Sequence, residues 1–136
     1  MKKSESAIQQ EIYIWFFNNY CLKLDNPKCC MFSVPNEMIG TMSGVLKSEG
    51  FKESLIKRIV NAVFRKFKNT GFLPGISDLI VLFPNKAMFF EVKTSVGSQS
   101  PKQKEFQRTV ELLGFEYHLV RSLEDFKKII QKHLFN

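Results

Sequence analysis

The spacing of apolar residues along the chain predicts helices that alternate with strands. In four stretches, apolar side chains recur every three or four residues, which is the period of an amphipathic helix. Serine precedes the first and the last of these stretches and proline opens the third, as is typical of helix starts. We therefore expect helices over 4–24, 51–68, 101–113 and 122–135.

Short apolar runs bounded by proline, asparagine or glycine predict four strands. The runs 76–83 and 87–93 are apolar on both faces, which is typical of central strands covered by helices. The other expected strands are 29–34 and 115–120, and the segment 40–50 is ambiguous. This order of elements predicts an α/β fold in which helices flank a mixed central β-sheet, with 87–93 and 115–120 parallel.

Charge points to the class of partner. The chain has 136 residues, the size of one ordinary domain, with 20 Lys and Arg against 13 Asp and Glu, a net charge of +7. A small, strongly basic domain favours a polyanion, with nucleic acid first. No apolar run approaches the roughly 20 residues of a membrane span, so we expect a cytoplasmic protein with no membrane partner. The odd cysteine count and spacing favour buried free thiols over disulfides or zinc: Cys21, Cys29 and Cys30.

Charged residues inside the two central strands are the candidate chemistry. If the turn between these strands centres on 84–85, counting back from it places Asp78 opposite Glu91. Directly opposed residues lie on one face of a sheet, with Cβ atoms about 4.5–5.5 Å apart. Lys93 is two residues beyond Glu91, so it shares that face.

Two carboxylates at this separation repel each other unless a positive group holds them. A hard divalent cation such as Mg²⁺ accepts one or two carboxylates and keeps several waters. Beside it, Lys93 could orient the attacking water or stabilise charge on a phosphate, which is the chemistry of phosphodiester hydrolysis. The alternative is a structural ion pair at the end of a sheet.

The residues themselves resemble a known family. Gly75-Ile76-Ser77-Asp78 followed by Glu91-Val92-Lys93 resembles the core of the PD-(D/E)xK nucleases. More narrowly, the chain resembles the stand-alone form of the virus-type replication-repair nucleases, the VRR-NUC family. Four more stretches carry the likeness: Ser4-Glu5 with Gln9, Val34-Pro35-Asn36, the residues 100–106, and the residues 117–122. In one departure, Ser77 stands where the family usually has proline.

This resemblance implies a restriction-endonuclease-like core and one nuclease domain over 1–136, with a basic helical insertion at about 51–70. It also implies a Mg²⁺- or Mn²⁺-dependent DNA endonuclease, often a homodimer, that acts on structured DNA as Holliday-junction resolvases do. Many such proteins are encoded by phages, so the implied setting is the cytoplasm of a bacterial or phage-infected cell.

The resemblance also implies roles for particular residues. Asp78, Glu91 and the carbonyl of Val92 would hold the metal, and Lys93 would be the catalytic lysine. Glu5 is the choice for a helix glutamate that reaches the metal, with Glu11 as its rival. The remaining candidates are Gln103, which could point back at the site, and the DNA contacts Gln9, Asn36, Lys102, Lys57, Arg58, Arg65 and Lys68.

Several alternatives stay open at this level. The basic face of 51–68 could contact DNA or simply be a solvated helix face, and its apolar stripe could serve the core or a dimer seam. The protein could be a DNA-binding module that keeps the fold without catalysis, or a flap or duplex nuclease. A sequence-specific restriction enzyme would need base-reading loops for which this short chain has little room.

Overall fold

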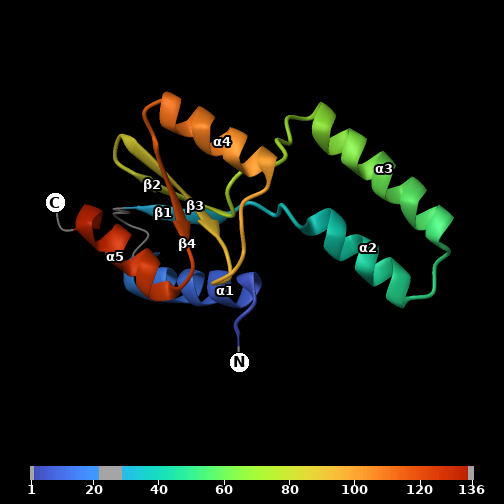
Figure 1. Cartoon of the computed structure of the whole chain (residues 1–136), viewed down its shortest axis with the longest axis horizontal. Coiled ribbons are helices and arrows are strands. Elements are labelled where there is room, and N and C mark those ends of the chain that lie inside the picture. Colours follow the sequence, from blue (N-terminus) through green and yellow to red (C-terminus); the bar gives the residue numbers. More distant parts are fainter. Residues whose placement is uncertain (1, 22–28, 135–136) are drawn as a thin grey trace. The chain divides into compact units, whose positions relative to one another are not determined.

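The computed structural model describes residues 2–21 and 29–134 (Figure 1). The chain folds as two compact units, and each is described by itself. The first unit contains Met1–Val34 and Ser77–Asn136, and the second contains Pro35–Ile76. The expected basic insertion lies inside the second unit. In the described parts of the chain, no helix is long and apolar enough to cross a membrane.

The first unit is built on a mixed four-stranded sheet, which confirms the predicted α/β fold. Its strands are β1 (Cys30–Ser33), β2 (Leu79–Phe83), β3 (Lys86–Val92) and β4 (Glu116–Val120). They lie in the order β1-β2-β3-β4, so the two predicted central strands are central. β1 and β3 are antiparallel to β2, and β4 is parallel to β3 as expected.

Helices cover both faces of this sheet. α4 (Pro101–Leu112) lies on one face, and α1 (Glu5–Phe16) and α5 (Leu123–Leu134) lie on the other (Figure 1). A short π-helix, Phe17–Cys21, follows α1. The last residues of the expected helix 4–24, residues 22–24, lie outside the described residues.

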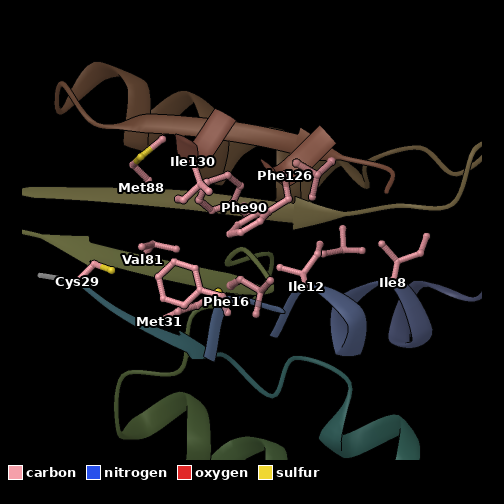
Figure 2. Close-up of a cluster of buried hydrophobic side chains, with 13 residues drawn as sticks. Ile8, Ile12, Phe16, Cys29, Met31, Val81, Met88, Phe90, Phe126 and Ile130 are labelled. Carbon is pink, nitrogen blue, oxygen red and sulfur yellow. The ribbon is translucent and has the colours of Figure 1, made fainter. Parts of the chain in front are cut away.

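The main core fills the space between the sheet and helices α1 and α5 (Figure 2). Alternate β3 residues, Met88, Phe90 and Val92, point to this side and are fully buried. The ring of Phe90 lies 4.7 Å from that of Phe126, centroid to centroid. Phe89 points to the opposite face, where the rings of Phe106 and Phe115 pack on it from α4 and its C-terminal turn.

The edge strand β1 corrects the expectation that the cysteine thiols are buried. Of its four residues only Met31 is buried, because an edge strand has a neighbour on one side only. Cys29 is buried but Cys30 is exposed, since successive side chains of a strand point to opposite faces. Both are free thiols, and the side chain of Cys21 lies outside the described part of the chain.

The second unit is a pair of helices, α2 (Met38–Ser48) and α3 (Glu53–Asn69), in contact with each other. The ambiguous segment 40–50 is thus mostly helical. Ile56 is the buried residue of α3, and Phe72 packs its ring on Phe64 and Phe67. At the base of this unit, Asn36 Nδ2 donates to the carbonyl of Ile76 at 2.6 Å.

Candidate active site

The site lies where β2 begins and β3 ends. The observed pairing of β2 with β3 ends at Leu79 and Phe90 and has the register that the sequence predicts, and Asp78 and Glu91 are the next residues along the two strands. Asp78 Oδ2 accepts a hydrogen bond from the backbone amide of Val92 at 2.8 Å. In an extended strand the N–H and C=O of one residue point to the same side. The Val92 carbonyl therefore faces the Asp78 side of β3.

Glu91 is completely buried and is held by three side chains. Its Oε1 accepts from Gln103 Nε2 and from Lys93 Nζ, the latter at 2.9 Å, and its Oε2 accepts from the Tyr117 hydroxyl at 3.3 Å. A capping box fixes the Gln103 amide, because Gln103 Oε1 accepts from the Ser100 amide at 2.8 Å. The Gln103 NH₂ group is therefore turned toward Glu91.

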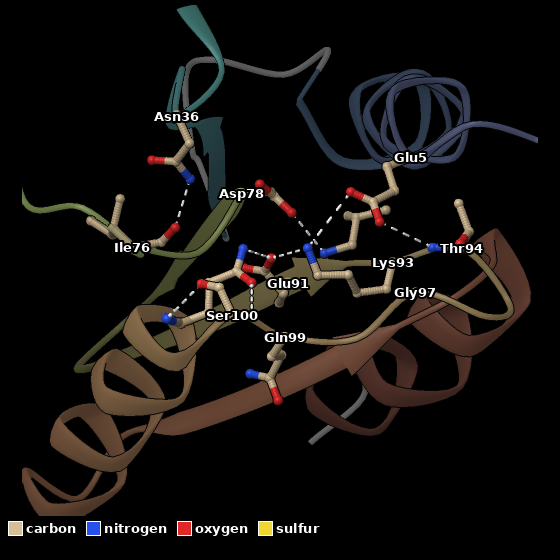
Figure 3. A network of polar contacts seen from close by, with 12 residues as sticks. Glu5, Asn36, Ile76, Asp78, Glu91, Lys93, Thr94, Gly97, Gln99 and Ser100 are labelled. Atoms are coloured by element: carbon tan, nitrogen blue, oxygen red, sulfur yellow. Dashed lines mark hydrogen bonds and ion pairs between the residues drawn. The ribbon is translucent and has the colours of Figure 1, made fainter. Parts of the chain in front are cut away.

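Lys93 connects this buried carboxylate to α1 (Figure 3). Its Nζ lies 3.6 Å from Glu5 Oε2, and Glu5 Oε1 accepts from the Thr94 amide at 3.4 Å. The rival glutamate, Glu11, instead forms a surface ion pair with Lys3 at 2.6 Å. Of the two candidates, the structure brings Glu5 to the site.

Burial and charge change the protonation of these groups. Burial, with the charge of Asp78 second, raises the pKa of Glu91 to about 7, although Lys93 opposes the shift. Burial alone would lower the pKa of Lys93, but the hydrogen bond and charge of Glu91 raise it above its usual value. Burial and the charge of Glu91 raise the pKa of Tyr117, so its hydroxyl remains a donor.

These residues suit a hard cation held by few protein ligands. In residues 2–21 and 29–134, no three His, Cys, Asp or Glu side chains are grouped so that they could hold a metal ion. Glu5 is separated from the other two carboxylates by the Lys93 ammonium, which contacts both Glu5 and Glu91. Two carboxylates and a carbonyl are nevertheless enough for Mg²⁺, which binds one or two carboxylates and keeps its waters.

The other predicted residues are distributed over both units. Gln9 lines a shallow hollow with Tyr13 and Ser33, one helical turn from Glu5. Lys102 is exposed near the start of α4. Asn36 and the four basic residues of α3 belong to the second unit, where Asn36 binds Ile76 and the basic side chains are exposed: Lys57, Arg58, Arg65 and Lys68.

Sequence reasoning missed the residues that support the site. Arg121 donates from Nη1 to the carbonyls of Thr94 and Gly97 and so holds the loop that follows Lys93. The sequence pattern assigns Tyr117 to the last strand and gives it no role in the site. Its signal was a tyrosine in a strand covered by a helix, because a buried tyrosine hydroxyl usually finds a polar partner.

Comparison with known proteins identifies the fold and the family. A solved structure described as a VRR_NUC domain protein matches the fold with a TM-score of 0.66 at 15% sequence identity. The alignment covers 99% of this chain and 91% of the other. Among curated proteins, none matches the sequence. The model of the VRR-NUC domain matches residues 5–124, so this chain belongs to the VRR-NUC domain family.

Proposed function

We propose that this protein is a Mg²⁺- or Mn²⁺-dependent DNA endonuclease. The observation that carries the proposal is the buried Glu91, with Lys93 Nζ 2.9 Å from its carboxylate and Asp78 bound to the amide of the next residue, Val92. A fully buried carboxylate beside a second, half-buried one is costly unless cations offset their repulsion. The family supports the same chemistry, because its fold is that of a nuclease.

In this proposal, Asp78, Glu91 and the Val92 carbonyl hold the metal. The bound ion would polarise the scissile phosphate and lower the pKa of a water molecule. Gln103 keeps the Glu91 carboxylate in place. Lys93 remains protonated and binds a phosphate oxygen or orients the water, and Glu5 keeps the Lys93 ammonium at the end of β3.

DNA is the substrate that a nuclease domain with net charge +7 favours. We propose branched or junction DNA in particular, cut by a homodimer that sets two sites against two strands. The exposed basic residues of α3 are candidates for phosphate contacts in the same complex, with Gln9, Asn36 and Lys102 as further candidates.

Cleavage of labelled four-way junction, flap, duplex and single-stranded DNA, with Mg²⁺ or EDTA, tests this function. We expect metal-dependent cutting by the wild type, loss in Lys93→Ala and Asp78→Ala, and no loss in Lys104→Ala, an exposed lysine of α4. Symmetric junction nicks would support the resolvase, whereas cutting of flaps or plain duplex would keep the nuclease and reject the resolvase. Binding without cutting in any divalent metal would leave a DNA-binding module.

A further inference from the structure

A chain of hydrogen bonds runs from solvent along α4 to the buried Glu91. Glu111 Oε1 accepts from Gln107 Nε2 at 2.8 Å, and Gln107 Oε1 accepts from Gln99 Nε2 at 2.9 Å. Gln99 Nε2 also donates to the Tyr117 hydroxyl at 3.3 Å, and that hydroxyl donates to Glu91 Oε2 at 3.3 Å. The chain begins on an exposed helix face and ends inside the candidate active site.

The direction of every donor in this chain follows from its exposed end, Glu111. An ionised carboxylate can only accept, so Glu111 turns the NH₂ group of Gln107 toward itself and leaves the Gln107 oxygen facing Gln99. Gln99 must then present its NH₂ group, whose second hydrogen points at Tyr117. A tyrosine hydroxyl has one proton, and because its oxygen accepts from Gln99, that proton is directed to Glu91.

Glu91 is thereby held at both oxygens by donors that are themselves held in place. Gln103 donates to Oε1 and is oriented by the cap of α4, whereas Tyr117 donates to Oε2 and is oriented by Gln99. Tyr117 is 7% exposed and Glu91 is fully buried, so water does not replace this bond easily. Partners of this kind orient metal-binding carboxylates and typically change metal affinity 10–100-fold.

We propose that Tyr117, set as a donor by Gln99, is the positioning residue that orients the Glu91 carboxylate for the metal. This proposal rests on the metal-dependent function proposed above. Tyr117 acts through Glu91 and does not touch the substrate. Its loss therefore acts on metal binding and, through it, on turnover, and leaves the affinity for DNA unchanged.

The test compares Tyr117→Phe and Gln99→Met with Tyr20→Phe, which removes a phenolic hydroxyl beside Trp15 and Phe16 instead. Mn²⁺ affinity is measured by calorimetry, thermal unfolding in EDTA reports the fold, and kcat and KM for DNA are measured over a Mn²⁺ series. We expect about tenfold weaker Mn²⁺ binding or more in both site variants. We expect KM for DNA to be unchanged and kcat to recover at high Mn²⁺, while Tyr20→Phe binds Mn²⁺ like the wild type.

Wild-type Mn²⁺ affinity in Tyr117→Phe would overturn the proposal and leave the nuclease function standing. If Tyr117→Phe unfolds, Gln99→Met decides, because it keeps the Tyr117 side chain and removes the amide that directs its hydroxyl, together with the bond from that amide to Gln107. Wild-type affinity in a folded Gln99→Met would then overturn the proposal. A wild type that neither binds Mn²⁺ nor cuts DNA would instead refute the proposed function, and this inference with it.

Discussion

Gly97 lies directly against the carboxylate of Glu5: a Cβ on Gly97 would be 3.1 Å from Glu5 Oε1 and equally close to Thr94 Oγ1. Few real Cβ contacts are that short. A side chain at Gly97 would therefore require Glu5 Oε1 and Thr94 Oγ1 to move by a few tenths of an ångström.

Gly97→Ala should displace Glu5 and reduce metal-dependent cleavage while leaving the fold intact. The backbone of Gly97 does not have a positive φ, so the alanine acts through its methyl group alone. Gly44→Ala is the matched control, because a Cβ there meets open space. In the helix α2 it should stabilise the protein by up to about 1 kcal/mol and leave cleavage unchanged. Equal cleavage by Gly97→Ala and the wild type would contradict the role given to Glu5.

The raised pKa of Glu91 predicts a particular dependence of stability on pH. The folded state holds the Glu91 proton up to about pH 7, whereas the unfolded chain releases it near its ordinary value of 4.5. In EDTA, stability should therefore fall as the pH rises from about 4.5 to 7, by about 3 kcal/mol from this group.

Glu91→Gln isolates that contribution, because a glutamine does not ionise. The difference in unfolding free energy between Glu91→Gln and the wild type, measured by urea titration, should shift by about 3 kcal/mol in favour of the variant between pH 4.5 and 7.5. A difference that is constant with pH would show that Glu91 ionises normally in the fold.

Arg121 should be needed for the loop that follows Lys93. Arg121→Met removes the donors to the carbonyls of Thr94 and Gly97 and should cost about 2 kcal/mol, the usual value for hydrogen bonds to charged groups. Cleavage should fall as well, since Thr94 and Gly97 both adjoin Glu5. Arg108→Met, at an exposed position on α4, controls for the loss of charge and should retain both stability and activity.

Salt dependence tests whether α3 contacts DNA. Each phosphate contact contributes about 0.9 to the slope of log K against log salt for duplex DNA. Arg58→Gln with Arg65→Gln should therefore lower that slope by up to about 2 if both bind phosphates. The control, Lys128→Gln with Lys132→Gln on α5, makes the same change of net charge. Equal slopes for the two double variants would show that Arg58 and Arg65 do not contact phosphates and that the basic face of α3 is simply solvated.

The register of the two central strands could be predicted from the sequence, because the local pattern of apolar and turn residues determines it. The short turn between two apolar runs sets their pairing, and that pairing runs from Phe83 and Lys86 to Leu79 and Phe90, next to Asp78 and Glu91. The helix start at Pro101 could be predicted for the same reason, since its cap and first turn lie within four residues.

What the sequence could not predict depends on contacts between distant segments. The helix α2 contains Gly40 and Gly44, which are poor helix formers, and its packing on α3 outweighs their propensity. The exposure of Cys30 follows from the edge position of β1, which depends on the order of the whole sheet. Tyr117 meets Gln99 only because α4 returns the chain across β3 to β4.

The second unit lies between β1 and β2 in the sequence without breaking the pairing of these two strands. Ser33 is paired with Leu79, and the Val34 amide donates to the carbonyl of Asp78 at 2.9 Å, so the chain leaves and re-enters the sheet at adjacent positions. The pairing of β1 with β2 is thus made by residues on either side of Pro35–Ile76. Changes in the length or sequence of Pro35–Ile76 should therefore be compatible with the same strand pairing, and with it the same position of Glu91.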